Sequence, residues 1–295
     1  NLLVKTVMKA EAEGDRFAFG VEQEFYLFKL DENGKPTKEP YDEAGYMDIA
    51  PDDRGENIRR EICLTLEQMG IRPESSHHEQ GPGQNEIDFR YSDPITAADN
   101  AMTFQTVVRT VAHRNGLYAD FSPKPLADQP GNGFHINMSV KADDGSNNLH
   151  YMIAGILEKA DQMTAFLNPT ENSYKRLGVQ KAPGYISWSS ENRSQLIRIP
   201  AAEGEYNRAE LRSPDPTANP YLAFTLMIEA GLYGIKNRLD LPPEVDSNLY
   251  EADAKILSKL KPLPKDLETA CKLAAKSSFI KQCLPEAILN SYLSR

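Results

Sequence analysis

Cysteine is scarce in this sequence of 295 residues, which contains only Cys63, Cys271 and Cys283. Their odd number and wide spacing exclude a disulfide framework and a thiolate zinc site, and they favour reduced thiols in the cytoplasm. Long apolar runs are lacking as well. The most apolar stretch, near 220–235, is short and contains Glu229, which predicts a buried helix and not a membrane span.

An excess of basic residues is also absent. The net charge of −10 argues against a nucleic-acid partner, which requires a basic face. The sequence carries no glycine-rich phosphate loop of the Walker or Rossmann kind, so any nucleotide would have to be held by metals and arginines. We find no internal repeat, no low-complexity linker and no signal peptide, and we therefore expect one domain over residues 1–295.

What is present is a mixture of helical and alternating segments. Apolar residues at helical spacing predict helices within 1–14, 52–70, 93–116, 149–167 and 219–239. Alternating residues predict strands at 17–28, 71–78, 85–91, 117–121, 133–141, 194–199 and 207–213. Without regular βαβ alternation, this order predicts an α+β fold with grouped strands and helices packed on one side. The polar stretch 31–54, rich in Gly, Pro and Asp, predicts a functional or disordered loop.

The strand expected at 17–28 contains two glutamates in an otherwise apolar run. Because strand side chains alternate between faces, Glu22 and Glu24 point the same way. Two buried carboxylates side by side are costly unless cations meet them, so the pair indicates a metal site. A solvent-facing edge with hydrated acids is the alternative reading of the same pattern.

Three further strands repeat this pattern of one apolar face and one ionisable face. The ionisable faces carry Glu86, Asp88 and Arg90; His135, Asn137 and Ser139; and Arg208, Glu210 and Arg212. A solvated sheet face would show the same alternation. The concentration of Glu, His and Arg instead favours a sheet curved around a charged, ligand-filled channel.

The residue types on these faces define a chemistry. Glutamate oxygens with one imidazole suit hard divalent ions such as Mg²⁺ or Mn²⁺, and the candidate ligands are Glu22, Glu24, Glu79, Glu86, His135 and Glu210. Arginines offer planar forks for phosphate or carboxylate groups, and the candidates are Arg176, Arg193, Arg198, Arg208 and Arg212. Acids together with arginines are typical of metal-assisted phosphoryl transfer. We interpret His77 and His78 as structural strand residues rather than ligands.

Six motifs, in order and near-family spacing, resemble the catalytic domain of the bacterial type I glutamine synthetases. They lie at 20–25 (GVEQEF), 77–87 (HHEQGPGQNEI), 131–139 (GNGFHINMS), 192–194 (NRS), 197–200 (IRIP) and 210–221 (ELRSPDPTANPY). The resemblance covers almost the whole chain. It implies the family fold, in which a curved, mostly antiparallel sheet forms a metal-lined channel with helices on its outside.

The resemblance also implies a role for each matching residue. One metal ion would be held by Glu24, Glu79 and Glu86, and the second by Glu22, His135 and Glu210. Glutamate would be bound by Gly131, Arg176 and Arg212. The transferred phosphate would meet Arg193 and Arg198, which with Arg212 form the catalytic set. The nucleotide would lie along Asn137, Ser139 and Arg208.

By the same resemblance the chain would act as a glutamate–ammonia ligase. ATP would phosphorylate glutamate to γ-glutamyl phosphate, and ammonia would then displace phosphate to give glutamine. Mg²⁺ or Mn²⁺ would be the cofactor and ATP a co-substrate. The family assembles as stacked hexameric rings, so we expect a cytoplasmic homo-oligomer, a dodecamer if the protein is intact, with no nucleic-acid or membrane partner.

Two residues and one domain depart from the family pattern. Lys181 stands where the mobile flap normally carries a glutamate that helps to deprotonate ammonium; a lysine is ordinarily cationic at pH 7 and would repel ammonium. Pro130 stands where an asparagine is common. The family's small N-terminal β-grasp-like domain, which completes a neighbouring subunit's site, has no counterpart in these residues. Either the sequence is a fragment, or the chain lacks half of its site.

These departures leave three hypotheses open. The first is glutamine synthesis, and the second is a γ-glutamyl ligase for another amine, although Lys181 would also repel a cationic polyamine. The third is a non-catalytic protein or fragment of this family, against which stands the intact set of metal ligands. Tyr250 matches a tyrosine that some relatives adenylylate, but its presence alone is weak evidence for that modification.

Overall fold

The computed structural model describes residues 2–200 and 207–293. Its strands are β1 (Asp15–Leu30), β2 (Pro36–Pro40), β3 (Pro73–His78), β4 (Gln84–Ser92), β5 (Leu117–Asp120), β6 (Phe134–Ala142), β7 (Tyr185–Ile186), β8 (Trp188–Ser190), β9 (Ile197–Ile199), β10 (Ala209–Leu211) and β11 (Lys261–Pro262). The large sheet runs β3-β4-β1-β6-β10-β9-β8, and β2 and β5 also pair with β1. Among its described pairs only β8 with β9 is parallel. The predicted α+β class with a mostly antiparallel sheet is confirmed.

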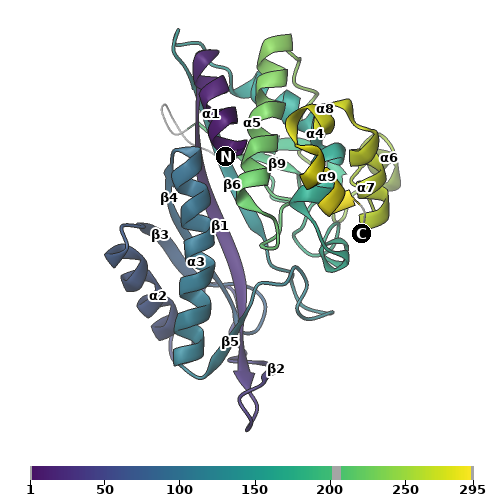
Figure 1. Ribbon diagram of the computed structural model, residues 1–295. Helices are drawn as coiled ribbons and strands as arrows, with labels where there is room; N and C mark the ends of the chain where they lie inside the picture. Colours follow the sequence, from purple (N-terminus) through teal and green to yellow (C-terminus); the bar gives the residue numbers. More distant parts are fainter. Residues whose placement is uncertain (1, 201–206, 294–295) are drawn as a thin grey trace.

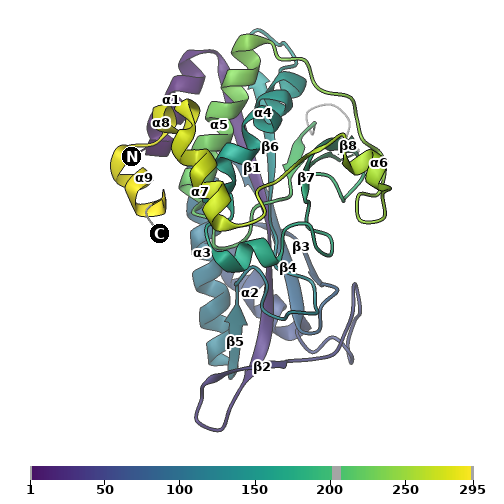
Figure 2. The ribbon, with the colours of Figure 1, turned by 90° about the vertical axis from the view of Figure 1, so that its right-hand side faces the viewer.

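Most of the helices cover one side of this sheet. The helices are α1 (Leu2–Ala12), α2 (Glu56–Gln68), α3 (Pro94–Arg114), α4 (Leu149–Leu167), a 3₁₀ turn η1 (Glu171–Lys175), α5 (Pro220–Asn237), α6 (Ala254–Leu257), α7 (Leu267–Lys276), α8 (Ser278–Cys283) and α9 (Glu286–Leu293). The long strand β1 runs through the middle of the molecule, with α3 and α5 lying along it (Figure 1). After a quarter turn, α1, α3 and α5 stand on one side of β1, and β7, β8 and α6 stand on the other (Figure 2).

The apolar faces of the strands and helices meet in one buried layer. Phe19 of β1 stacks on Phe224 of α5 with ring centroids 4.3 Å apart, and both side chains are fully buried. Phe25 of β1 packs edge-on against Phe104 of α3. Among the described residues no helix has both the length and the apolar character needed to cross a membrane.

Helix α3 begins where the sequence pattern indicates. The carboxylate of Asp93 accepts hydrogen bonds from the backbone amides of Ile95 and Thr96, both at 3.1 Å, and Pro94 occupies the first turn. Burial alone would raise the pKa of Asp93, but these hydrogen bonds lower it. Asp93 is therefore an N-cap that also fixes the start of a helix in the apolar layer.

The helix predicted to follow Asp52 and Asp53 is confirmed as α2, which begins at Glu56. The bounds of two predicted strands are wrong. The strand expected at 194–199 is reduced to β9, and residues 194–196 form a turn and a bend. The strand expected at 207–213 is reduced to β10.

The stretch 31–54 is ordered, so the disordered alternative is wrong. It contains β2, which pairs with β1, and then an irregular segment over the end of β3. The backbone amide of Met47 donates to the carbonyl of His78 at 3.0 Å. This contact brings a loop that is distant in sequence against the strand that carries His77 and His78.

Candidate active site

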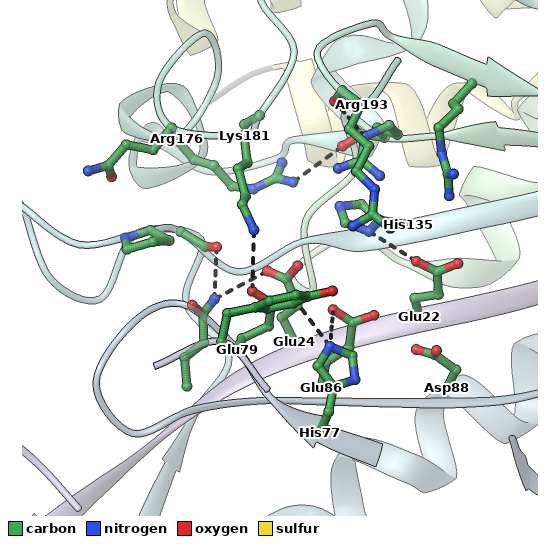
Figure 3. Close-up of a pocket in the computed structure, with 18 of the residues that line it drawn as sticks. Glu22, Glu24, His77, Glu79, Glu86, Asp88, His135, Arg176, Lys181 and Arg193 are labelled. Atoms are coloured by element: carbon green, nitrogen blue, oxygen red, sulfur yellow. Dashed lines mark hydrogen bonds and ion pairs between the residues drawn. The ribbon is translucent and has the colours of Figure 1, made fainter. Parts of the chain in front are cut away.

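The acids converge because strand register places them opposite one another. On β1, Glu22 pairs with Asp88 of β4 on one side and with His135 of β6 on the other. Glu24 pairs with Glu86 of β4. Directly opposed residues on one face of a sheet have neighbouring side chains. The face of the sheet away from α3 and α5 is therefore lined with carboxylates, which Figure 3 shows pointing into one pocket.

One group of possible ligands gathers around His135. The ligand atoms of Glu22, His135 and Glu210 all lie within 4.8 Å of one another. The His135 Nδ1 is 3.3 Å from Glu22 Oε2 and 3.7 Å from Glu210 Oε1. Burial and the nearby Arg212 hold the pKa of His135 well below its usual range, which favours the neutral imidazole that binds metals.

A second group lies beside the first. Atoms of His77, Glu79 and Glu86 also lie within 4.8 Å of one another. Glu24 lines the same pocket, but among the described residues it belongs to none of the groups whose ligand atoms lie within 4.8 Å of one another. Its Oε2 accepts a hydrogen bond from the backbone amide of Gly133 at 2.7 Å. His77 Nε2 is 3.4 Å from Glu79 Oε1. The interpretation of His77 as purely structural therefore misses its place in the pocket.

The electrostatics of this pocket favour a bound cation. Burial, followed by the charge of Glu79, raises the pKa of Glu24 to about 7. Burial and neighbouring acids, Asp88 first, raise the pKa of Glu86 well above its usual range. The pKa of Asp88 is likewise raised to about 7, by burial and by Glu22. These shifts mean that the buried acids repel one another and are costly to ionise. The donor set of carboxylate oxygens and imidazoles fits a hard divalent ion.

Glu79 differs from its neighbours because cationic groups face it. Burial would raise its pKa, but a hydrogen bond from His77 and the charge of Lys181 lower it to about 2. The Lys181 Nζ is 3.8 Å from Glu79 Oε2 and 4.9 Å from the centre of the Tyr46 ring. Lys181 and the preceding Gln180 have φ angles of +63° and +38°, an uncommon backbone conformation for residues other than glycine. This left-handed turn aims the lysine into the pocket, as Figure 3 shows.

Arginines line the wall opposite the acids. Arg198 and Arg212 both pair with Glu210, which is fully buried. Arg176 is also buried, and its guanidinium donates to the carbonyls of Ser213 at 2.7 Å and Arg212 at 3.2 Å. Arg193, Arg198, Arg176 and Arg212 line the pocket together with Tyr250. The pocket thus presents acids on one wall and guanidinium groups on the other.

The loop that carries Gly131 forms another wall. A Cβ atom at Gly131 would lie 2.4 Å from the carbonyl oxygen of Pro123 and 2.9 Å from Arg176 Cγ, so only glycine fits there. The carbonyl of Pro130 accepts a hydrogen bond from the Tyr26 hydroxyl at 2.7 Å. The loop is therefore anchored through its backbone.

The residues expected to meet the nucleotide line an adjoining groove. Asn137, Ser139 and Arg208 all line it, together with Glu22 and Tyr91. Arg208 Nε donates to Asn137 Oδ1 at 2.9 Å, and Asn137 Nδ2 donates to Glu22 Oε1 at 2.8 Å. Glu22 and Asp88 line both the groove and the acidic pocket, so the two are continuous.

Several pocket residues are absent from the candidate site derived from the sequence, among them Asp88, Gln84 and Tyr46. Asp88 lies two residues after Glu86 and so on the same strand face, and this alternation is enough to place it in the site. Gln84 is the first residue of β4, and its Nε2 donates to the Gly131 carbonyl at 3.1 Å. Tyr46 belongs to an irregular loop, where no periodicity indicates which side chains point inward.

Comparison with known proteins agrees with this geometry. The family model described as "Glutamine synthetase, catalytic domain" matches residues 1–295. A glutamine synthetase of Methanosarcina mazei is 46% identical over an alignment of 308 residues. This alignment covers 99% of this chain and 69% of that protein. A glutamine synthetase of Staphylococcus aureus is 46% identical over 94% of this chain and 66% of that protein. The chain thus spans about two thirds of the length of these relatives.

Solved structures show the same relationship. A structure described as a GmaS/ADP complex superposes with a TM-score of 0.88 at 30% identity, covering 99% of this chain and 71% of that one. The glutamine synthetase of Plasmodium falciparum shares the fold, with a TM-score of 0.86 at 24% identity over 99% of this chain and 74% of that one. Since the family model matches from end to end and relatives are nearly half identical, this chain belongs to the glutamine synthetase family.

Proposed function

We propose that this chain carries the active site of an ATP-dependent ligase that joins the side-chain carboxylate of glutamate to an amine, with ammonia as the first candidate. The observation that carries the proposal is a single pocket with five carboxylates on one wall and four arginines on another, open to a groove that suits a nucleotide. Family membership supports the same activity.

Two divalent ions, Mg²⁺ or Mn²⁺, would be held by the acidic wall. Glu24, Glu79 and Glu86 would bind one, and Glu22, His135 and Glu210 the other. The ions would offset the negative charge of the phosphate groups and of the substrate carboxylate. The raised pKa values of Glu24 and Glu86 support this assignment, because a bound cation would offset the burial and the neighbouring negative charges that cause them.

The arginines would orient the two anionic substrates. Arg176 and Arg212, beside Gly131, would bind glutamate, and Arg193 and Arg198 would face the transferred phosphate. A side-chain oxygen of glutamate would attack the γ-phosphorus, the bond to ADP would break, and γ-glutamyl phosphate would form. The amine would then attack the acyl carbon, phosphate would leave, and the amine nitrogen would lose a proton.

ATP would lie in the groove formed by Asn137, Ser139 and Arg208. The hydrogen bonds from Arg208 to Asn137 and from Asn137 to Glu22 connect this groove to the acidic wall. The GmaS structure that shares this fold at 30% identity is described as a complex with ADP, which supports a nucleotide site in this chain.

A different acceptor amine is the second candidate, and Lys181 favours it. Its ammonium group lies 3.8 Å from Glu79 Oε2, so it brings positive charge to the pocket that ammonium would have to enter. Like charges repel, and an acceptor without positive charge would not meet this barrier.

The test is ATP-dependent phosphate release by the full-length protein with glutamate, Mg²⁺ and a panel of amines that includes ammonia. Ammonia-dependent turnover supports glutamine synthesis, whereas turnover only with another amine supports the second candidate. No turnover with any amine would support a non-catalytic family member. Lys181→Glu should raise kcat/KM for ammonia, and Lys181→Arg should not; unchanged ammonia kinetics in Lys181→Glu would remove the argument for another amine.

We also propose that residues 1–295 form a single domain and that the full-length protein is a cytoplasmic homo-oligomer, with a dodecamer as the expected form. The family assignment supports both statements. Light scattering on the full-length protein would give the mass of the assembly, and a monomeric mass would contradict the second statement.

A further inference from the structure

A buried histidine–aspartate pair lies directly behind the acidic wall. On β3, alternation sends His77 into the pocket and His78 to the opposite side, where its side chain is fully buried. There the His78 Nε2 is 2.8 Å from Asp42 Oδ1, and the Nδ1 is 2.6 Å from the backbone oxygen of Glu79. The His78 ring therefore bridges a carboxylate and a main-chain carbonyl.

The Asp42 carboxylate is also hydrogen-bonded to the backbone. Its Oδ1 also accepts a hydrogen bond from the amide of Gly83 at 3.0 Å, and its Oδ2 accepts one from the amide of Arg54 at 3.1 Å. Asp42 is only 6% exposed, although it belongs to the loop before α2 and lies far from His78 in sequence. The Asp42–His78 pair therefore links that loop to the backbone at Glu79.

Two contacts fix the backbone of Glu79 from opposite sides. Its carbonyl faces the His78 ring, and its amide donates to the Gln84 carbonyl at 2.8 Å. The turn 79–84 is in turn held by Asp42 through Gly83. Because the direction of a side chain follows from its backbone, these contacts set where the Glu79 carboxylate enters the pocket.

The buried cluster is not itself a metal site, even though the ligand atoms of Asp42, Asp53 and His78 lie within 4.8 Å of one another. Arg59 already neutralises Asp53, with Arg59 Nη2 2.6 Å from Asp53 Oδ2 and Arg59 Nη1 3.2 Å from Asp53 Oδ1. Both ring nitrogens of His78 and both oxygens of Asp42 are engaged. The polar atoms are satisfied by one another, as expected of a support and not of a ligand set.

We infer that the Asp42–His78 pair is a positioning device that sets the affinity of the Glu79–Glu86 cluster for a divalent ion. The inference rests on the proposed function, since it assigns that cluster to a metal. Groups behind a metal ligand that orient it commonly change metal affinity about tenfold or more when they are replaced. Neither Asp42 nor His78 lines the pocket, so the pair would act through the backbone of Glu79 and of the turn that follows it.

The test compares Asp42→Asn with Asp53→Asn in the full-length protein. The two aspartates are similarly buried, at 6% and 3% exposed, but the carboxylate of Asp53 makes its hydrogen bonds with Arg59. Mn²⁺ binding is measured by electron paramagnetic resonance, and unfolding is measured by thermal denaturation without metal. Both variants should lose stability, but only Asp42→Asn should weaken one class of Mn²⁺ sites, by about tenfold.

A second variant keeps the test informative if Asp42→Asn does not fold. His78→Asn retains an amide donor that can reach only one of the two acceptors, so it should also weaken Mn²⁺ binding. Equal Mn²⁺ affinity in the folded variants and in the unmodified protein would overturn the positioning role, and so would equal losses in Asp42→Asn and Asp53→Asn. If the unmodified protein itself bound no Mn²⁺, the metal assignment of the proposed function would fall with it.

Discussion

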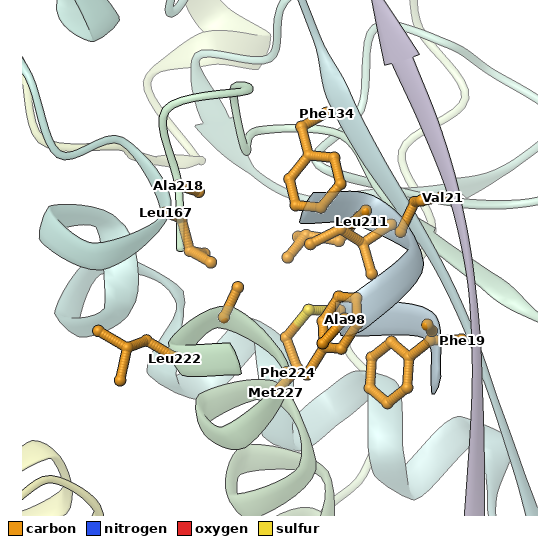
Figure 4. Close-up of a cluster of buried hydrophobic side chains, with 14 of the residues drawn as sticks. Phe19, Val21, Ala98, Phe134, Leu167, Leu211, Ala218, Leu222, Phe224 and Met227 are labelled. Carbon is orange, nitrogen blue, oxygen red and sulfur yellow. The ribbon is translucent and has the colours of Figure 1, made fainter. Parts of the chain in front are cut away.

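The two faces of β1 carry opposite chemistry along a single strand. Phe19, Val21 and Phe25 point to the helices, where Phe19 stacks on Phe224 in a mostly apolar layer that Figure 4 shows between the sheet and α5. Glu22 and Glu24 point to the other face and line the candidate active site. Both faces are largely closed to solvent at this point, since Glu24 is only 8% exposed.

The comparison shows that burial has opposite consequences on the two faces. On the helix face it removes apolar surface from water, which stabilises the fold by about 25 cal/mol per Å². On the acidic face it raises the pKa of Glu24 to about 7, a sign that the ionised form is costly there. We conclude that the apolar layer stabilises a strand whose other side is suited to bind cations.

The largest expected effect comes from breaking the apolar side. Phe224→Ala would leave a cavity beneath Phe19 and lower the free energy of unfolding by about 3–5 kcal/mol. Chemical denaturation measures this loss. Lys236→Ala, on the exposed side of the same helix, should change stability little. Similar losses in the two variants would contradict the assignment of the core.

A change on the acidic side of β1 should weaken metal binding and leave the stability of the protein unchanged. Glu24→Gln would remove a charged ligand and weaken Mn²⁺ binding by about tenfold or more, without lowering the stability of the metal-free protein. Isothermal titration calorimetry and thermal denaturation give the two quantities. Glu32→Gln, at an exposed turn, is the matched control. A Glu24→Gln protein that binds Mn²⁺ normally would exclude Glu24 from the metal site.

A smaller effect tests the helix layer through the cap of α3. Asp93→Ala should lower the free energy of unfolding by about 1 kcal/mol at neutral pH. The pKa of Asp93 is lowered in the folded state, so its contribution is present above the unfolded pKa of about 3.9 and is lost as pH falls through the folded value.

The stability difference between the unmodified protein and Asp93→Ala should therefore shrink in acid. Asp93→Asn keeps a capping oxygen but cannot titrate, so it should retain most of the stability without this pH dependence. Urea denaturation at several pH values separates the three proteins. A difference that stays constant down to about pH 3 would show that the carboxylate charge plays no part.

The smallest expected effect concerns the influence of Lys181 on metal binding at the acidic face. Lys181→Met would remove a positive charge 3.8 Å from Glu79 Oε2 and should tighten Mn²⁺ binding about threefold, because the lysine is partly exposed and screened by solvent. Lys181→Arg retains the charge and should match the unmodified protein. Weaker Mn²⁺ binding in Lys181→Met would contradict the view that the lysine opposes the metal.

Strand alternation made most of the acidic face predictable. The pattern around Glu22 and Glu24 persists along β1, so a single period assigns both residues to one face. The family motifs added individual roles for Glu79 and the arginines, some of which lie in strands or loops too short for periodicity to be informative. The fold class followed from the same alternation together with the absence of regular βαβ order.

What the sequence left unassigned depends on irregular backbone and long-range contact. Tyr46 and Asp42 lie in a loop without periodicity, and their partners Lys181 and His78 are far away in the chain. Two-residue and three-residue strands are set by pairing with distant segments: β9 pairs with β10 at one end of the large sheet, and β11 pairs with β7 in a separate two-stranded sheet. Local propensity says little about such elements.

The hydrogen bond from Tyr26 to the carbonyl of Pro130 has a consequence for how this pocket can diversify. Every amino acid supplies a main-chain oxygen, so the tether survives whatever residue occupies that position. Evolution could exchange the residue next to Gly131 and reshape the entrance to the cavity while the loop kept its course. Replacing asparagine by proline at position 130 would then change the lining of the pocket and leave the course of the loop unchanged.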